Sequence, residues 1–388
     1  MIAQTSTVRQ KRAGAWLTVL CVLSWSTADA GLKSVIPAPQ LGAKSHILVD
    51  YLTSSVLAEH NANERLEPAS LTKIMTVYVA GHALQSSLIA LDDEIKVSEK
   101  AWRMEGSRMF IEAGKRVSVD DLLQGVIVQS GNDASVALAE HISGTEDVFA
   151  SVMTDHARKL GMTNSNFTNS TGLPDPNTYT TAKDMAVLSS ALIREFPKLY
   201  ARFDIQEFTY NNIRQSNRNR LLFLDESADG LKTGHTEAAG YCLVSSAERD
   251  GVRLISAVMG AKSDTERTEA SLTLINYGYR FFETRELYRD SEVITTLKIW
   301  KGAAEKIDLG PSDTVFVTIP RGRHDDLKAT ANVDAPLIAP IRKGQTLGRM
   351  VISLDGEQLA AVPLLALDDI DTGSFFVRLY DNVMLIFE

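Results

Sequence analysis

The chain has 388 residues, of which 44% are hydrophobic and 23% are charged, so it is long enough to form one large domain and a smaller one. Its net charge of −9 excludes a nucleic-acid-binding protein, because phosphate binding requires a basic surface. Its seven histidines show no pair at metal-ligand spacing and no glycine-rich phosphate loop is present, so we expect neither a metal nor any other cofactor.

The N-terminus has the pattern of an export signal. Basic residues between positions 9 and 12 precede an apolar run at 13–25, and Ala28-Asp29-Ala30 then supplies small residues at a cleavage site. The sequence therefore predicts a signal peptide at residues 1–30. An uncleaved membrane anchor is the alternative, but the run is shorter than the roughly 20 apolar residues that span a bilayer.

Residues 31–286 are predicted to form one α/β domain. Two apolar runs at 46–60 predict a β-hairpin, and apolar residues at helical spacing after Pro68 place Ser70 near a helix N-terminus. Strands at the two ends with helices between them imply a sheet that joins remote segments. The later elements are expected in this order: helices at 119–129, 133–142, 148–160 and 182–195, strands at 241–246 and 254–259, and a long helix at 266–282.

The pattern changes to β-strands after Thr284. Apolar runs rich in β-branched residues alternate with turn signals at Gly310-Pro311 and Asp355-Gly356. We therefore expect a separate all-β domain at 287–368. It contains no cluster of candidate catalytic groups, which favours a spacer or interaction module.

The C-terminal segment, 369–388, has the pattern of an amphipathic helix that anchors the protein peripherally at a membrane surface. One helical face gathers the apolar residues Phe375, Phe376, Leu379, Val383, Ile386 and Phe387. At roughly 1.5 Å per residue, the 14 residues from Phe375 onward span about 21 Å, which is too short to cross a bilayer. The alternative is a terminal helix packed on the β domain.

Three short motifs place candidate catalytic residues in order along the chain. They are Ser70-Leu71-Thr72-Lys73, Ser130-Gly131-Asn132 and Lys232-Thr233-Gly234. On a helix Ser70 and Lys73 share a face, so the amine can reach the hydroxyl. A lysine can take a proton from serine only when the lysine is neutral, which requires burial or a neighbouring cation, a role open to Lys232. Each motif alone is weak, and only the order of the three is specific.

The motifs and their flanking sequences resemble those of the low-molecular-mass penicillin-binding D-alanyl-D-alanine carboxypeptidases. The flanking sequences are Pro68-Ala69-Ser70-Leu71-Thr72-Lys73, Gln129-Ser130-Gly131-Asn132-Asp133-Ala134 and Asp229-Gly230-Leu231-Lys232-Thr233-Gly234-His235-Thr236. The likeness extends from about Gly31 to the C-terminus. It implies the α/β penicilloyl-serine transferase fold, which is β-lactamase-like, with an antiparallel sheet flanked by helices and a small all-β C-terminal domain.

The resemblance also implies a role for each motif residue. Ser70 would attack the carbonyl of the penultimate D-alanine with Lys73 as general base, and Ser130 would pass a proton to the departing amine. Six residues would bind the substrate: Asn132 an amide, Lys232, Thr233 and Arg267 the terminal carboxylate, Gly234 the substrate backbone and the His235 N–H the oxyanion.

Several of these assignments have alternatives. Arg267 could instead be a solvated charge on its helix. Asp184 and Arg218 are expected to pair and support the loop beside the site. Cys242 lies in an apolar stretch and is predicted to be a buried small hydrophobe rather than a nucleophile.

The resemblance implies a periplasmic enzyme, held at the outer face of the inner membrane, that removes the terminal D-alanine from peptidoglycan pentapeptides. β-Lactams would acylate Ser70 and leave slowly. A β-lactamase is one alternative, but the deacylating glutamate of its best-studied class has no counterpart between Glu146 and Glu195. A non-catalytic cell-wall scaffold is the other alternative, and endopeptidase action on cross-links stays open.

Overall fold

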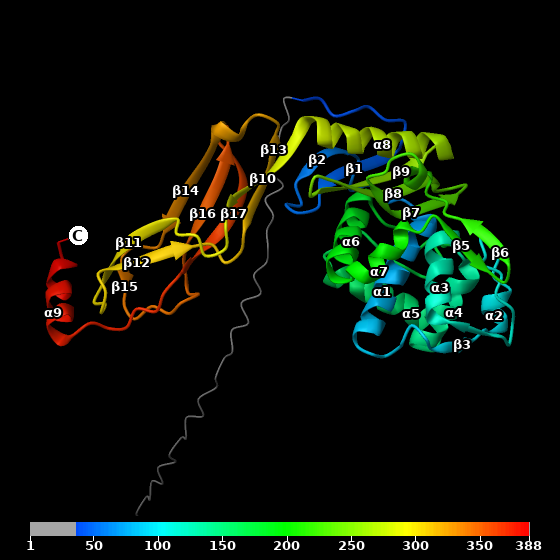
Figure 1. The fold of residues 1–388 in the computed structure, drawn as a ribbon, viewed down its shortest axis with the longest axis horizontal. Helices are drawn as coiled ribbons and strands as arrows, with labels where there is room; N and C mark the ends of the chain where they lie inside the picture. The colour runs from blue at the N-terminus through cyan, green and yellow to red at the C-terminus, as the bar shows by residue number, and fades with distance from the viewer. Residues whose placement is uncertain (1–35, 388) are drawn as a thin grey trace, which may run out of the picture. The chain divides into compact units, whose positions relative to one another are not determined.

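The computed structural model describes residues 36–387. The signal peptide predicted at 1–30 lies outside the described residues. Within them, separate hydrophobic cores form in an α/β domain and in an all-β domain that follows it in the chain (Figure 1). The predicted fold class is therefore confirmed.

An antiparallel sheet of five strands forms the centre of the α/β domain, in the order β2-β1-β9-β8-β7. The strands are β1 (Ser45–Asp50), β2 (Val56–His60), β7 (Ala228–Thr236), β8 (Gly240–Arg249) and β9 (Val252–Ala261). The hairpin predicted at 46–60 is present as β1 and β2, and β1 pairs with the remote strand β9. Strand β7 is an edge strand, so its outer backbone groups are free to pair with a ligand.

Helices cover both faces of this sheet because its central strands are apolar on both sides. In β1, Ile47 and Val49 belong to the core shared with most of the helices, whereas Leu48 belongs to the core under α8 (Asp264–Phe281). This alternation is the period of two that a strand imposes on its side chains. Figure 1 shows α8 on one face of the sheet and α1 and α6 on the other.

The other helices of this domain are α1 (Thr72–Gln85), α2 (Glu99–Trp102), α3 (Val119–Gln124), α4 (Asn132–Ser143), α5 (Glu146–Lys159), α6 (Ala182–Glu195) and α7 (Pro197–Tyr200). Helix α1 is buried continuously from Thr72 to Gly81, as expected of a helix that is apolar on all sides. Its burial takes Lys73 into the domain interior. Two small antiparallel sheets of two strands accompany the helices: β3 (Glu94–Lys96) with β4 (Arg116–Ser118), and the hairpin of β5 (Glu207–Tyr210) with β6 (Ile213–Ser216).

The all-β domain begins with β10 (Phe282–Tyr288), which pairs with β13 (Val315–Pro320). A six-stranded sheet follows in the order β14-β16-β17-β12-β11-β15. Its strands are β11 (Thr295–Trp300), β12 (Lys306–Gly310), β14 (Leu327–Val333), β15 (Leu337–Ile338), β16 (Thr346–Leu354) and β17 (Glu357–Ala366). Alternate residues of β16, such as Met350 and Ile352, fill the core of this domain.

Helix α9 (Phe375–Met384) forms half of the C-terminal segment 369–388. None of its residues is buried, and Phe376 and Ile386 are 79% and 78% exposed. The alternative in which this helix packs its apolar face on the β domain is therefore wrong. Of the helices among residues 36–387, none is both long enough and apolar enough to cross a membrane.

Candidate active site

Ser70 lies in the short 3₁₀ turn Ala69–Leu71, directly before α1. Ala69 adopts the left-handed conformation, with φ at +46°, which for a residue with a Cβ costs about 1–2 kcal/mol. One turn further along, Lys73 Nζ lies 3.1 Å from Ser70 Oγ. The spacing of the first motif therefore brings the amine to the hydroxyl as predicted.

Lys73 is held by three partners at once. Its Nζ donates to Asn132 Oδ1 at 2.7 Å and to the Thr171 carbonyl at 2.7 Å, besides its contact with Ser70. Asn132 is fixed in turn, because its Nδ2 donates to the Glu105 carbonyl at 2.6 Å. Asn132, predicted to bind a substrate amide, thus also positions the candidate base.

The pKa of Lys73 is lowered to about 7, chiefly by burial and next by the positive charge of Arg218. An amine with a pKa near 7 is substantially neutral at physiological pH, so its lone pair can accept the serine proton. The sequence suggested Lys232 as the cation that lowers the pKa of Lys73, whereas in the structure this cation is Arg218. The charge of Lys73 instead lowers the pKa of Lys232, second to burial.

Ser130 follows a π-helical turn, Gly125–Gln129, that continues α3. The sequence predicted a single helix through Gln129 and missed this turn, a feature that often marks functional sites. Ser130 is left-handed, with φ at +63°, and its buried Oγ has no hydrogen-bond partner among the described residues. The hydroxyl is therefore free to contact a substrate.

Asp133 fixes the loop in front of this second motif, a role that the sequence did not reveal. Its carboxylate accepts hydrogen bonds from the backbone N–H groups of Met109, Phe110 and Ile111 at 2.9, 2.9 and 3.3 Å. An acidic residue in the first turn of a helix is also favoured by the helix dipole. The position of Asp133 in the first turn of α4 was the feature of the sequence that could have indicated this role.

The third motif lies on β7 against the turn that carries Ser70. A Cβ on Gly234 would lie 2.9 Å from the Pro68 carbonyl oxygen and 3.2 Å from Ser70 N. Glycine is therefore needed here to let the strand approach. Lys232 and Thr233 are buried, whereas His235 is exposed and packs on Tyr241 with ring centroids 4.0 Å apart.

Arg267 is buried behind β7 and is not a solvated helix charge, so that alternative is wrong. Its Nη1 donates to the carbonyls of Gly234 and Cys242 at 3.0 and 3.2 Å, and its Nη2 pairs with Asp264. It thereby ties two neighbouring strands to α8. Cys242 is buried as predicted, and burial raises the pKa of its thiol to about 11.

Asp184 and Arg218 do not form the predicted pair. The Asp184 carboxylate accepts from Asn164 N at 3.0 Å and Ser165 Oγ at 2.6 Å, because its place in the first turn of α6 directs it at this loop. Arg218 lies between Asn217 and Asn219, two buried residues hydrogen-bonded to the backbone. Its charge acts on the two motif lysines instead.

A second missed feature is the loop that supplies the Thr171 carbonyl to Lys73. Glu146 holds this loop by accepting from Ser170 N at 3.0 Å and Ser170 Oγ at 2.7 Å, and it pairs with Lys100 at 2.8 Å. With these partners, Glu146 serves the loop.

Gly172 offers a test of this loop. Its φ is +78°, and an added Cβ would lie 1.8 Å from the Ala69 carbonyl oxygen. Gly172→Ala is expected to destabilise the protein by about 3 kcal/mol and to lower the reactivity of Ser70 at least tenfold, because the turn of Ser70 must move. Gly114→Ala is the matched control, since Gly114 has φ at +79° with open space around it. Equal losses of activity and melting temperature in both variants would contradict this reading.

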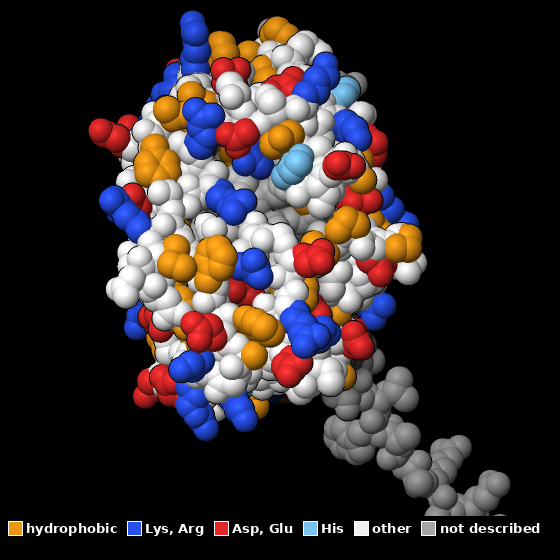
Figure 2. All heavy atoms as spheres, turned by 90° about the vertical axis from the view of Figure 1, so that its right-hand side faces the viewer, with side chains coloured by type: hydrophobic (Ala, Val, Ile, Leu, Met, Phe, Trp, Pro, Cys, Tyr) orange, Lys and Arg blue, Asp and Glu red, His pale blue; other side chains and the backbone are white. Residues whose placement is uncertain are grey.

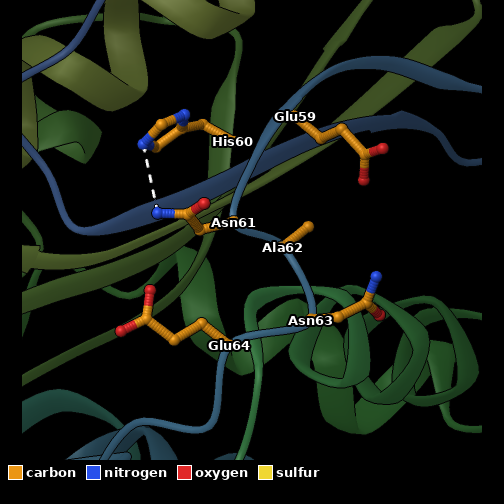
Figure 3. Close-up of a pocket in the computed structure, with 6 residues that line it drawn as sticks. All are labelled: Glu59, His60, Asn61, Ala62, Asn63 and Glu64. Atoms are coloured by element: carbon orange, nitrogen blue, oxygen red, sulfur yellow. Dashed lines mark hydrogen bonds between the residues drawn. The ribbon is translucent and has the colours of Figure 1, made fainter.

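A cavity of about 590 Å³ lies where β2 ends, and no candidate catalytic residue lines it. Its lining residues are Glu59, His60, Asn61, Ala62, Asn63 and Glu64 (Figure 3). Its polar groups satisfy one another in part, since Asn61 Nδ2 and His60 Nε2 are 3.2 Å apart. Among residues 36–387, no cluster of three potential metal ligands is found.

A half-buried serine beside a lysine whose pKa is lowered to about 7, a second serine and a lysine-bearing edge strand define a serine enzyme of the acyl-transfer type. The comparisons with known proteins agree. Residues 33–263 match the family model described as D-alanyl-D-alanine carboxypeptidase, and residues 282–372 match penicillin-binding protein 5, C-terminal domain. The chain belongs to the D-alanyl-D-alanine carboxypeptidase family.

Individual relatives resemble the chain over nearly its whole length. It is 44% identical to D-alanyl-D-alanine carboxypeptidase DacC of Escherichia coli, over 92% of this chain and 91% of the relative. Penicillin-binding protein 5 of Haemophilus influenzae matches with a TM-score of 0.83 and 40% identity, covering 87% and 99% of the two chains. The ampicillin-bound penicillin-binding protein D2 of Listeria monocytogenes matches with a TM-score of 0.58 and 29% identity, covering 63% and 100%. The chain is therefore a serine-type D-alanyl-D-alanine carboxypeptidase, and the scaffold alternative is set aside.

Proposed function

We propose that Ser70, Lys73 and Ser130 carry out the carboxypeptidase reaction. Ser70 Oγ attacks the carbonyl carbon of the penultimate D-alanine while its proton passes to neutral Lys73 Nζ. The tetrahedral intermediate collapses, the C–N bond breaks, and the leaving D-alanine amine takes a proton through Ser130 Oγ. Water then attacks the resulting ester, with Lys73 again accepting a proton, and Ser70 is restored. The 3.1 Å contact between Lys73 Nζ and Ser70 Oγ carries this proposal.

The remaining motif residues bind the substrate in this scheme. The side chains of Lys232, Thr233 and Arg267 receive the terminal carboxylate, whose negative charge favours the protonated form of Lys232 and so a charge-assisted hydrogen bond. Gly234 admits the peptide backbone to the edge of β7. The N–H groups of Ser70 and His235 stabilise the oxyanion, where each donor contributes about 3 kcal/mol.

The substrate is a peptidoglycan pentapeptide that ends in D-alanyl-D-alanine. Incubation of the protein with such a pentapeptide, followed by mass spectrometry, should show loss of one alanine residue. An untouched pentapeptide would contradict the proposal. A cross-linked dimer assayed in parallel tests endopeptidase activity, because its cleavage breaks the same kind of D-alanyl bond.

β-Lactams are expected to acylate Ser70 and to leave slowly. The ampicillin-bound relative supports acylation, and the partners of Glu146 support slow release, because this carboxylate is engaged by Ser170 and Lys100. β-Lactamase activity is therefore not favoured. Rapid turnover of penicillin, monitored by loss of its ring absorbance, would overturn this expectation.

The exported enzyme is proposed to reside in the periplasm, with α9 lying on the outer face of the inner membrane. The apolar face of the helix is exposed, and burying such side chains in lipid is favourable by roughly 1.5–3 kcal/mol each. The helix thereby anchors the enzyme peripherally.

This anchor can be tested by changing its apolar face. The double variant Phe376→Asp with Ile386→Asp should bind vesicles of phosphatidylethanolamine and phosphatidylglycerol at least tenfold more weakly in a sedimentation assay. Val148→Asp is the control, because Val148 is an exposed apolar residue of α5, at 52%. If the double variant sediments with vesicles like the wild type, the anchor is elsewhere.

A further inference from the structure

A second cavity, of about 290 Å³, lies beside the second motif. Three large apolar side chains on its wall are exposed: Trp102 by 44%, Phe110 by 43% and Ile213 by 39%. Polar groups stand among them, namely those of Arg108, Glu112 and Asn211. Figure 2 views the side of the molecule on which α2 and β6 lie in Figure 1, and there hydrophobic side chains are interspersed with charged ones.

The walls of this cavity are held rigidly to the active site. The Asp133 carboxylate binds the N–H groups of Phe110 and its neighbours, and Gln215 Nε2 on β6 donates to the Met109 carbonyl at 3.3 Å. Phe110 keeps a left-handed φ of +71°, a strained conformation that persists only where the surroundings hold it. The cavity is therefore preformed, and its wall adjoins Asn132, a contact of Lys73.

The chemistry of the lining matches a sugar ring. An indole and a phenyl ring offer flat apolar faces on which the C–H face of a pyranose can stack, while the guanidinium, carboxylate and amide at the rim can bind hydroxyl and acetamido groups. Small-molecule sites typically combine an apolar lining with a few such polar groups. The guanidinium of Arg108 lies over the Phe110 ring, 5.5 Å from its centroid, and its positive charge is offset in the lining by the negative charge of Glu112. The lining therefore favours a neutral ligand over a strongly anionic one.

The substrate carries a sugar ring at the end of its peptide that is remote from the reacting bond. A pentapeptide can extend about 17 Å from its reacting end, at about 3.5 Å per residue. Its sugar-bearing end must therefore be received beyond the catalytic residues. We propose that the cavity lined by Trp102 and Phe110 binds an N-acetylhexosamine ring of the glycan strand that carries the peptide, which rests on the proposed action on peptidoglycan.

The test compares two substrates, the free pentapeptide and the same pentapeptide attached to its disaccharide. In the wild type, kcat/KM for D-alanine release should be about five- to tenfold higher for the disaccharide form, with the difference in KM. Trp102→Ala should remove this preference and Trp102→Phe should retain part of it. Phe376→Ala, an exposed aromatic change in α9, is the control and should keep the full preference.

Each outcome separates the subsite from the reaction. Equal kcat/KM for both substrates in the wild type would overturn the subsite while leaving the carboxypeptidase reaction intact. An equal loss of kcat/KM on both substrates in Trp102→Ala would also overturn the subsite, because it would indicate a contact with the peptide itself or a disturbed active site. Absence of D-alanine release from either substrate in the wild type would instead contradict the proposed function. A matching unfolding temperature for each variant confirms that the comparison is between folded proteins.

Discussion

Ser70→Ala is expected to abolish both D-alanine release and covalent labelling by a fluorescent penicillin. The variant removes the oxygen that forms the acyl-enzyme, and loss of a catalytic serine costs about 10⁴-fold or more in related chemistry. Lys73 loses one partner but keeps Asn132 and the Thr171 carbonyl. The fold should therefore survive, and a gel-based label together with a coupled D-alanine assay measures both effects.

Ser151→Ala is the matched control for this experiment. Ser151 lies on α5, where its Oγ donates only to the Asp147 carbonyl at 3.1 Å in an exposed position. This variant should label and hydrolyse like the wild type. If Ser70→Ala still accepted the label at the wild-type rate, another nucleophile would have to be sought.

Short sequence patterns predicted those parts of the site whose residues lie close together along the chain. Ser70 and Lys73 lie three residues apart at the start of one helix, so periodicity alone brings them together. The hairpin at 46–60 follows from patterns within a few residues, whereas the strand that carries Lys232, Thr233 and Gly234 was not among the strands predicted at 241–246 and 254–259. The fold class could be assigned because strands at both ends of the first domain enclose its helices.

The partners of buried charges could not be read from the sequence in the same way. Asp184 and Arg218 were matched by family position, yet the first bonds a loop near Ser165 and the second acts on Lys73. A side chain's partner depends on which elements pack beside it, and pairs remote in sequence carry no spacing signal. For the same reason, the sequence did not reveal that the Thr171 carbonyl accepts a hydrogen bond from Lys73.

Arg267 illustrates how burial decides between alternatives that look equal in sequence. Among neighbouring acidic residues it resembled a solvated helix charge. In the fold it is covered by β7 and β8 and donates to the Gly234 carbonyl. Burying an arginine is costly unless its donors are satisfied. The Nη1 and Nη2 groups of Arg267 have partners, whereas its buried Nε has none among the described residues. Its contact with the substrate carboxylate stays a prediction.

Replacing the candidate base should have the second large effect. Lys73→Met keeps much of the buried volume but removes the amine, so kcat/KM should fall by about 10²–10⁴-fold, the range of general-base catalysis. Asn132 Oδ1 and the Thr171 carbonyl would each lose a donor, which costs about 1–3 kcal/mol of stability per buried acceptor. The loss should appear in acylation, measured by the rate of penicillin labelling. Activity near the wild-type level would show that another group takes the serine proton.

The pH dependence tests the same assignment without removing the base. With its pKa lowered to about 7, Lys73 is protonated and inactive below that pH, so kcat/KM should rise with pH through about 7 and then level off. Arg218→Gln removes a positive charge that disfavours the protonated amine. The pKa of Lys73 should then rise, and the increase of kcat/KM should occur at higher pH. Arg214→Gln removes an exposed arginine that pairs with Glu207 and should leave the pH profile of kcat/KM unchanged. An unchanged profile in Arg218→Gln, or the same shift in both variants, would show that the charge of Arg218 does not set the protonation of the base.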